Sequence, residues 1–167
     1  MTAADEPGTS GVPYQDARQS AAALEIQRGV VRLLQAHGLA CLTELPLPNG
    51  RRADVVGLSE MGEIWMVEIK SSLADFRADL KWPDYREFSD RLFFAVKPDF
   101  PIEVLPDDAG LILADRYGGE IARPAPEMKL AGARRKSMAL RLGRAAAFRL
   151  AALLDPSLPA VIEPGGA

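Results

Sequence analysis

A short apolar stretch that contains two charged residues constrains this fold more than any other part of the chain. Residues 63–70 read Glu-Ile-Trp-Met-Val-Glu-Ile-Lys, and the β-branched and aromatic residues among them are typical of a buried strand. Alternate side chains of a strand point to opposite faces, so Glu68 and Lys70 project from the same face. A carboxylate buried among apolar side chains is costly unless a partner balances its charge. The stretch therefore predicts a strand that ends in a polar site.

A second acidic residue is expected opposite Glu68. Residues 52–58 form another predicted strand, and the linker 60–62 ends in a glycine, as a three-residue hairpin loop with a positive φ requires. A hairpin centred on this linker pairs residues whose numbers sum to about 122, which places Asp54 opposite Glu68. Directly opposed residues have β-carbons about 4.5–5.5 Å apart. We therefore expect Asp54, Glu68 and Lys70 to converge at one strand end.

The charges of this expected site favour a divalent cation. Two facing carboxylates repel each other unless a cation lies between them. Mg²⁺ or Mn²⁺ is the natural choice, because such an ion binds carboxylate oxygens and keeps water or phosphate oxygens as its other ligands. Lys70 can then orient or deprotonate an attacking water, or neutralise charge that develops on phosphorus. These roles fit hydrolysis of a phosphodiester. The alternative is an ordinary ion pair between Glu68 and Lys70, with Asp54 facing solvent.

The scarcity of cysteine and histidine excludes other kinds of site. The chain has one cysteine, Cys41, and one histidine, His37, so we expect no disulfide framework, no Cys-rich zinc site and no histidine-based hydrolase. His37 precedes Gly38 at the predicted end of a helix, where it is expected to interact with the helix dipole. We find neither a membrane-spanning segment nor a signal-peptide pattern, and therefore expect a cytoplasmic protein that does not bind membranes.

The order of the predicted elements indicates an α/β fold. A first helix is predicted at 17–37, because its apolar residues recur on one face and a glycine follows. The later elements are strands at 41–47, 52–58 and 63–70, a helix from Ser72 toward Trp82 that Pro83 interrupts, strands at 92–96 and 111–114, a hairpin at 117–119, and a helix at 131–154. We expect one domain at 17–154, with a central mixed sheet flanked by helices, between disordered tails at 1–16 and 155–167.

This arrangement resembles the PD-(D/E)XK, or restriction-endonuclease-like, nuclease superfamily, whose core order is αβββαβ. Asp54 matches the first motif acid, although Ala53 stands where the motif has proline, and Glu68-Ile69-Lys70 matches (D/E)XK. The resemblance covers residues 20 to 115. It implies that Asp54, Glu68 and the backbone carbonyl of Ile69 bind Mg²⁺ or Mn²⁺, and that Lys70 assists the hydrolysis of DNA.

Superfamily members often add an acid to this site from the first helix. Glu25 is the candidate by its order in the chain, and Glu44 in the first strand competes for the same role. We rank the two nearly equally. For Glu25, a surface ion pair with Arg28 or Arg32 is about as plausible. Asp75, which lies in the first turn of the next predicted helix, is expected to cap that helix rather than bind metal.

A finer resemblance, to the MmcB family, extends over most of the chain. It rests on residues 50–55, 67–72, 75–77 and 81–83, on Tyr85, and on the continuation through Asp115 to the basic C-terminal helix. The family is linked to bacterial DNA repair and the response to DNA damage, so the resemblance implies DNA as a partner, with other repair proteins as further partners. It implies no particular oligomeric state. The alternative to a nuclease is a non-catalytic module that uses the same fold to bind DNA or a repair partner.

Several residues near the expected site are candidates for DNA binding. Arg51 and Arg52 could bind a phosphate beside the metal. Lys81 and Tyr85 have the spacing of a glutamine–tyrosine pair in exonuclease-type relatives, but Pro83 lies between them, which is a departure from that pattern. A solvated strand edge is the alternative for the two arginines. Among the aromatic residues that could stack on a base, Trp82 is expected to belong to the core instead.

Basic residues are concentrated near the C-terminus. Residues 129–154 contain seven basic residues and no acidic one, whereas the rest of the chain has 13 basic and 23 acidic residues. On a helical wheel the apolar residues Leu142, Ala146, Leu150, Leu153 and Leu154 gather on one side, and Arg134, Arg141, Arg144 and Arg149 lie roughly opposite. We expect this helix to dock by its leucines and to present its arginines to the phosphate backbone of DNA. The alternatives are a helix that binds another protein and charge that only keeps the protein soluble, and the absence of acidic residues argues against the second.

Overall fold

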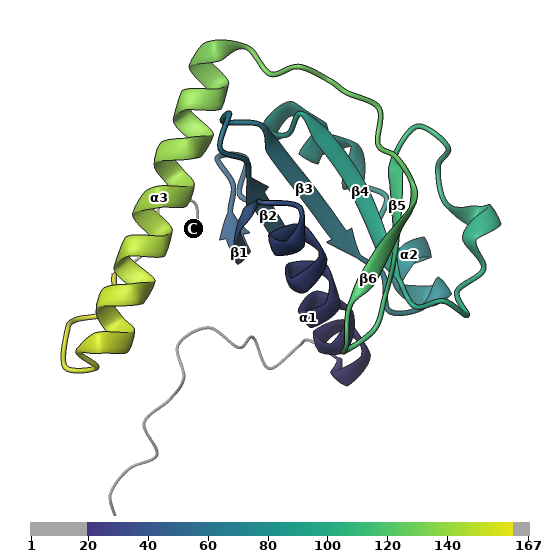
Figure 1. Cartoon of the computed structure of the whole chain (residues 1–167), viewed down its shortest axis with the longest axis horizontal. Coiled ribbons are helices and arrows are strands. Elements are labelled where there is room, and N and C mark those ends of the chain that lie inside the picture. The colour runs from purple at the N-terminus through teal and green to yellow at the C-terminus, as the bar shows by residue number, and fades with distance from the viewer. Residues whose placement is uncertain (1–19, 162–167) are drawn as a thin grey trace, which may run out of the picture.

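A six-stranded mixed sheet is the centre of the computed structural model, which describes residues 20–161 (Figure 1). Within that part of the chain, the strands lie side by side in sequence order. They are β1 (Ala40–Pro46), β2 (Arg52–Leu58), β3 (Ile64–Ile69), β4 (Arg91–Val96), β5 (Gly110–Ala114) and β6 (Gly119–Arg123). β1, β2 and β3 are antiparallel neighbours, β3, β4 and β5 run parallel, and β6 is antiparallel to β5. β1 and β6 are therefore the edge strands.

Helix α1 (Ala21–Ala36) covers one face of this sheet. The hydroxyl of Ser20 caps its first turn by accepting a hydrogen bond from the backbone N–H of Ala23 at 3.1 Å. As predicted, His37 lies at the end of the helix, where its ring Nδ1 is 2.9 Å from a carbonyl oxygen of the last turn. The apolar core beneath α1 includes Ile26, Val30, Leu34, Val55, Val67 and Ile112.

The other face of the sheet packs against α3 (Gly132–Leu154) and the 3₁₀ segment η1 (Trp82–Phe88). The core on this side includes Leu45, Val56, Met66, Phe88, Met138 and Leu142. A short helix, α2 (Leu73–Ala78), follows β3, and a second 3₁₀ segment, η2 (Ile102–Val104), follows β4. These segments belong to the crossovers that parallel neighbouring strands require.

The hairpin of β2 and β3 has the register that the sequence predicted. Val55 pairs with Val67, and the residue numbers of each of its four pairs sum to 122. Gly62 adopts a φ of 81° in the loop, a conformation that glycine reaches without strain. Asp54 and Glu68 are each the next residue at the end of this register. The hairpin therefore brings the two acids to the same end of neighbouring strands.

The predicted fold class is confirmed: an N-terminal helix, a six-stranded mixed sheet and a long C-terminal helix are present within residues 20–161. One helix is shorter than predicted. It begins after Ser72 and ends at Ala78 instead of running toward Trp82, because Asp79 has an extended conformation with φ −106° and ψ 91°. The chain restarts as η1 with Pro83 in the first turn, where the missing N–H of proline costs nothing.

Some predicted stretches lie wholly or partly outside the described residues: the tail at 1–16, the start of the helix at 17–37, and the end of the tail at 155–167. The described part of the second tail, 155–161, is exposed and contains no helix or strand. The extent of the domain stays a prediction. Within the part of the chain that the structure covers, every helix is too short or too polar to cross a lipid bilayer.

Helix α3 has nearly the predicted bounds but docks by a different face. Its buried residues are Met138, Leu142 and Ala145. Only Leu142 among the residues predicted to dock is buried, whereas Leu150, Leu153 and Leu154 are exposed. The predicted docking face is therefore wrong for the second half of the helix. The last turns of α3 extend past the sheet (Figure 1), so the sheet does not cover their apolar side chains.

Arginine side chains hold α3 against the edge of the sheet, although they were predicted to face outward. As an edge strand, β1 has outer carbonyl groups without a strand partner. Arg149 donates hydrogen bonds to the carbonyl oxygens of Thr43 and Glu44. Arg141 donates to the carbonyl oxygen of Pro46 at 3.2 Å. The prediction is wrong for these two arginines because a helical wheel does not show acceptors on a strand so distant in sequence.

Candidate functional site

The three residues predicted to form the catalytic site line a single pocket at one end of β2 and β3. Its volume is about 330 Å³. Asp54 comes from β2, Glu68 from β3, and Lys70 from the position that follows β3. The other lining residues are Ser20, Ala23, Arg52, Ile69, Ser71, Asp75, Asp79 and Tyr85. The structure therefore brings Asp54, Glu68 and Lys70 together, as the hairpin register predicts.

Glu68 is buried, with 3% of its surface exposed. Its Oε1 atom has no hydrogen-bond partner among the described residues. Burial, followed by the charge of Asp54, raises the pKa of Glu68 well above its usual range, and the positive charge of Lys70 offsets only part of this increase. A buried carboxylate with an unsatisfied oxygen is costly, so this atom indicates a place for a cationic or hydrogen-bonding ligand.

Asp54 is held in position by the neighbouring strand. The backbone N–H of Ile69 donates a hydrogen bond to its Oδ2 atom at 2.7 Å. Burial raises the pKa of Asp54 to about 7, because the hydrogen bond from Ile69 lowers it less than burial raises it, and the charge of Glu44 adds a further increase. The hydrogen bond fixes the carboxyl group beside Glu68. Near neutral pH, Asp54 can therefore change between its protonated and ionised forms.

The oxygen atoms of this pocket fit a hard divalent cation. Asp54 and Glu68 provide two carboxylates, and Ile69, whose backbone carbonyl is a predicted ligand, also lines the pocket. Within residues 20–161, no three Asp, Glu, His or Cys side chains form a group arranged to hold a metal ion. Two carboxylates suffice for Mg²⁺, which usually takes its remaining ligands from water and substrate phosphate. A cation between them would also remove the cost of ionising two buried acids.

Lys70 forms a buried ion pair that the sequence did not predict. Its Nζ atom lies 2.6 Å from Oδ2 of Asp79, and the lysine side chain is 4% exposed. Burial alone lowers the pKa of Lys70, but the hydrogen bond and charge of Asp79, with the charge of Glu68, raise it overall. Lys70 is therefore protonated at neutral pH. This state supports orienting a water or neutralising charge, and it does not support deprotonation of a water by Lys70.

Asp79 was missed because the predicted helix ran on past it. It is instead the C-cap of α2, and its Oδ1 accepts a hydrogen bond from the backbone N–H of Lys81 at 3.0 Å. Pro83 was the available signal, because a proline implies that a helix ends shortly before it. Asp75 also lines the pocket, but its Oδ2 accepts a hydrogen bond from the backbone N–H of Ser71 at 3.0 Å, in agreement with the predicted capping role.

Glu25 lies outside the pocket. Its carboxylate binds Lys97 at 2.8 Å and Arg116 at 2.9 Å, and the hydrogen bond from Lys97 is the main cause of a lowered pKa. The prediction that Glu25 joins the metal site is therefore not supported. The alternative prediction, a pair with Arg28 or Arg32, also named the wrong partners, because the observed ones come from the ends of two other strands.

Glu44 lies closer to the pocket but is engaged by other side chains. It is buried, its Oε2 atom is 2.7 Å from Nε of Arg52, and its Oε1 accepts a hydrogen bond from Gln27 at 3.3 Å. Its charge reaches Asp54, whose pKa it raises. Glu44 does not line the pocket itself. We therefore assign its charge to neutralising Arg52 rather than to binding a metal.

The predicted DNA-binding arginines beside the pocket are both paired with acids of the protein. Arg51 lies 2.8 Å from Asp84, and Arg52, which lines the pocket, is paired with Glu44. Both side chains keep some exposed surface. Contact with a phosphate would therefore compete with these ion pairs, so the two arginines are weaker candidates for phosphate binding than unpaired arginines would be.

The predicted aromatic contacts with DNA are not supported. Tyr85 is buried, and its hydroxyl donates a hydrogen bond to the carbonyl oxygen of Arg52 at 3.3 Å while it lines the pocket. Its ring cannot stack on a base in this position. Trp82 packs against Phe94, with ring centroids 5.3 Å apart, which confirms its expected place in the core. Lys81 is exposed, so its ammonium group is accessible to a phosphate.

The arginines of α3 divide into two groups. Arg141 and Arg149 bind β1, as described above. Arg134 and Arg144 are exposed. Arg134 pairs with Glu87 at 3.2 Å, and the guanidinium of Arg144 lies 5.4 Å from the ring centroid of Phe148. Arg144 is thus the predicted DNA-binding arginine of α3 that combines exposure with an exposed aromatic neighbour.

Comparison with known proteins gives two matches that span most of the chain. A family model described as DNA repair protein MmcB-like matches residues 10–157. A solved structure of the SPO1766 protein of unknown function from Silicibacter pomeroyi is 48% identical, with a TM-score of 0.81, and the match covers 86% of this chain and 99% of that one. A comparison with curated proteins found no match.

Proposed function

The chain belongs to the MmcB-like family of DNA repair proteins, and on this premise we propose that it is a metal-dependent deoxyribonuclease of the PD-(D/E)XK type. The observation that carries the proposal is the buried pair of Asp54 and Glu68 with Lys70 in one pocket. A pure binding surface has no need of two buried acids whose pKa values are both raised. Buried carboxylates with raised pKa values are typical of catalytic sites.

Asp54 and Glu68 would hold the ion, together with the backbone carbonyl of Ile69. When bound, Mg²⁺ or Mn²⁺ supplies a water of lowered pKa and neutralises charge on the phosphoryl oxygens. The unsatisfied Oε1 of Glu68 is the protein atom most in need of such a partner. The hydrogen bond from the Ile69 N–H keeps Asp54 oriented in the absence of substrate, so little reorganisation is required.

Lys70 would act as a fixed positive charge. Its ion pair with Asp79 keeps it protonated and restricts its ammonium group to one side of the pocket. From there it can donate a hydrogen bond to the attacking water or to a phosphate oxygen. Asp79 is then a positioning residue, because it acts on substrate only through Lys70.

A nuclease assay tests this proposal. Single-stranded, duplex and branched DNA would each be incubated with the protein and Mn²⁺ or Mg²⁺, alongside Asp54→Asn, Glu68→Gln and Lys70→Met. We expect cleavage by the wild type and a loss of at least about 100-fold in each variant, because each removes a group that acts on the reacting phosphate. Asp99→Asn, which changes an exposed carboxylate elsewhere, is the matched control. Equal cleavage by wild type and all three variants would show a contaminating nuclease and contradict the proposal.

The ion pair of Lys70 favours a second candidate function. With Asp79 bound to its Nζ, Lys70 has less freedom to reach a substrate, so the same pocket could bind a DNA end or flap without cutting it. Under this alternative the Asp54→Asn and Glu68→Gln variants would change DNA affinity, and the wild type would leave every substrate intact with either metal. Measurement of binding and cleavage on the same labelled DNA separates the two functions.

A further inference from the structure

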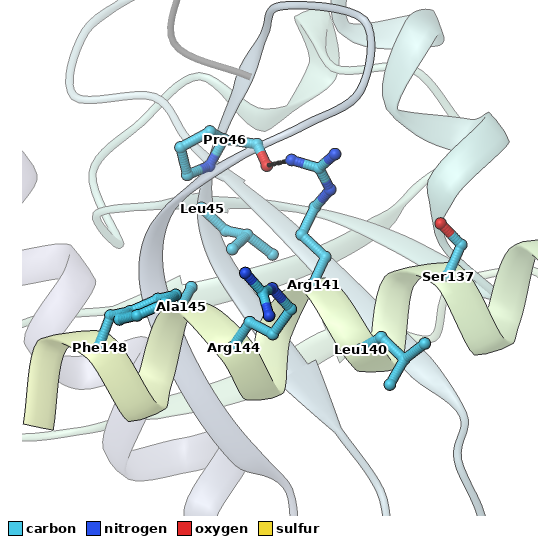
Figure 2. A pocket seen from close by; sticks show the side chains of 8 residues that line it. All are labelled: Leu45, Pro46, Ser137, Leu140, Arg141, Arg144, Ala145 and Phe148. Atoms are coloured by element: carbon cyan, nitrogen blue, oxygen red, sulfur yellow. Dashed lines mark hydrogen bonds between the residues drawn. The ribbon is translucent and has the colours of Figure 1, made fainter. Parts of the chain in front are cut away.

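A second pocket lies between α3 and the edge strand β1. It shares no residue with the pocket that contains Asp54, Glu68 and Lys70, which we call the carboxylate pocket. The second pocket has a volume of about 220 Å³ (Figure 2). We call it the α3–β1 groove. It is lined by Leu45 and Pro46 of β1 and by Ser137, Leu140, Arg141, Arg144, Ala145 and Phe148 of α3. Most of these residues are apolar, and no acidic residue is among them.

Large apolar side chains of the groove are open to solvent. Leu140 is 57% exposed and Phe148 is 36% exposed. These residues and Arg144 recur every fourth residue along α3, so they form one stripe on the helix surface. Figure 2 shows them on successive turns, with the arginine next to the phenylalanine ring. Exposed leucine and phenylalanine side chains beside a hollow are typical of a surface that receives side chains of a partner.

The electrostatics of the groove favour an acidic occupant. Arg141 and Arg144 line it, and the segment 129–154 around it has seven basic residues and no acidic one. A second copy of the chain docked symmetrically on this groove would bring two basic 129–154 segments together, and their like charges repel. An acidic partner would instead gain from both arginines. The charge of the groove therefore argues for a different, acidic molecule rather than for self-association.

The backbone of β1 limits how such a partner can bind. Its outer carbonyl groups at Thr43, Glu44 and Pro46 already accept hydrogen bonds from Arg149 and Arg141. An added strand needs those carbonyls, so β-augmentation at this edge is blocked. A nucleic-acid backbone would leave the exposed side chains of Leu140 and Phe148 without an apolar surface to pack against. A helix that inserts apolar side chains satisfies both conditions, because it needs no backbone contact.

We propose that the α3–β1 groove binds an acidic amphipathic helix of a protein partner. Apolar side chains from one face of that helix pack on Leu140 and Phe148 and enter the groove beside Pro46. Carboxylates on the flanks of the same face pair with Arg144. This role does not depend on whether the carboxylate pocket cleaves DNA, because the two pockets have no residue in common.

Selection from a random-peptide display library tests the proposal. The library would be selected on the full-length wild-type protein and depleted on the Phe148→Ser variant. We expect enriched peptides that carry acidic residues and place bulky apolar residues three and four positions apart. The affinity of the most enriched synthetic peptide, measured by fluorescence anisotropy, should fall at least about tenfold with Leu140→Ser, Phe148→Ser or Arg144→Glu. Leu154→Ser, at an exposed leucine outside the groove, should leave it unchanged.

Controls make each result decisive. Leu140, Arg144 and Phe148 are all exposed, so the variants should fold, and thermal melts would verify this for each one. If Phe148→Ser failed to fold, depletion on Arg144→Glu would replace it. Absence of a depletable peptide, or enriched peptides without acidic residues, would overturn the proposal. So would tighter binding of a single-stranded oligonucleotide than of any peptide with the same variant sensitivity, or a dimer in light scattering that Leu140→Ser dissociates.

Discussion

Replacement of Asp54 by asparagine should stabilise the metal-free protein above about pH 7. The pKa of Asp54 is raised by burial from 3.8 to about 7, so the folded state binds a proton more tightly than the unfolded state does. The contribution of Asp54 to stability is fully present below the pKa that it has in the unfolded state. This contribution is lost as the pH rises through the pKa that Asp54 has in the folded state. Asparagine carries no charge at any pH and can still accept the hydrogen bond from Ile69. The variant should therefore lack this pH-dependent loss.

The size of the effect follows from the shift. A difference of about 3 pKa units corresponds to roughly 4 kcal/mol, at about 1.4 kcal/mol per unit. The wild type should thus lose up to about 4 kcal/mol of unfolding free energy between about pH 4 and pH 8 through this residue. Glu68, whose pKa is also raised, acts in the same direction. A bound divalent ion should restore stability, by about 2.7 kcal/mol at one hundred times its dissociation constant.

Urea denaturation across this pH range, with EDTA or with Mn²⁺, measures both effects. The wild type should become less stable toward high pH in EDTA and regain stability with Mn²⁺. Asp54→Asn should keep only the part of the pH dependence that Glu68 causes, and should respond weakly to metal. Asp99→Asn, an exposed control, should behave as the wild type does. If the wild type and Asp54→Asn show the same pH dependence, or Mn²⁺ stabilises them equally, Asp54 is not a buried acid that binds a cation.

Other substitutions test contacts elsewhere in the fold and beside Lys70. Gly29→Ala would place a β-carbon 2.0 Å from a backbone carbonyl oxygen of the β5–β6 turn, so it should lower the free energy of unfolding, measured with urea, by more than about 3 kcal/mol. Gly143→Ala, in open space on α3, is the matched control and should be neutral or stabilising by up to about 1 kcal/mol. Asp90→Ala removes a buried carboxylate that pairs with Arg135 at 2.6 Å and accepts hydrogen bonds from two backbone N–H groups. We expect the free energy of unfolding to fall by about 3–5 kcal/mol in the same assay. The control Asp99→Asn should leave it unchanged. Asp79→Asn should lower the pKa of Lys70, because the largest effect that opposes burial is then lost. The high-pH limb of the cleavage profile should therefore move to lower pH; an unmoved limb would show that this lysine does not limit the rate.

The part of the site that the sequence predicted depends on local geometry. The register of the β2–β3 hairpin follows from its short loop, with Gly62 at the positive φ. Once that register is set, Asp54 and Glu68 must meet at the hairpin's open end. No contact between distant segments is needed for this step, which is why the sequence alone was sufficient.

The residues that were wrongly assigned depend on contacts between distant segments. Glu25 was placed by its position on a helix, but Lys97 and Arg116, from the ends of other strands, take its charge. The pairing of Lys70 with Asp79 depends on where a short helix ends, and sequence patterns locate helix ends poorly. In both cases the charge pattern was visible, but the partner could be chosen only once the chain was folded.

Glu44 connects α3 with the carboxylate pocket. Its φ of 52° is unusual for a residue other than glycine and costs about 1–2 kcal/mol, so surrounding contacts must hold it. Its carbonyl accepts a hydrogen bond from Arg149 of α3, and its carboxylate pairs with Arg52 of the pocket. The turn at Glu44 also lets Leu42 and Leu45 pack toward the same face, against the core beneath α3. The arginines of α3 therefore stabilise the strand whose distortion places a negative charge near Asp54, a role that their basic charge alone would not have suggested.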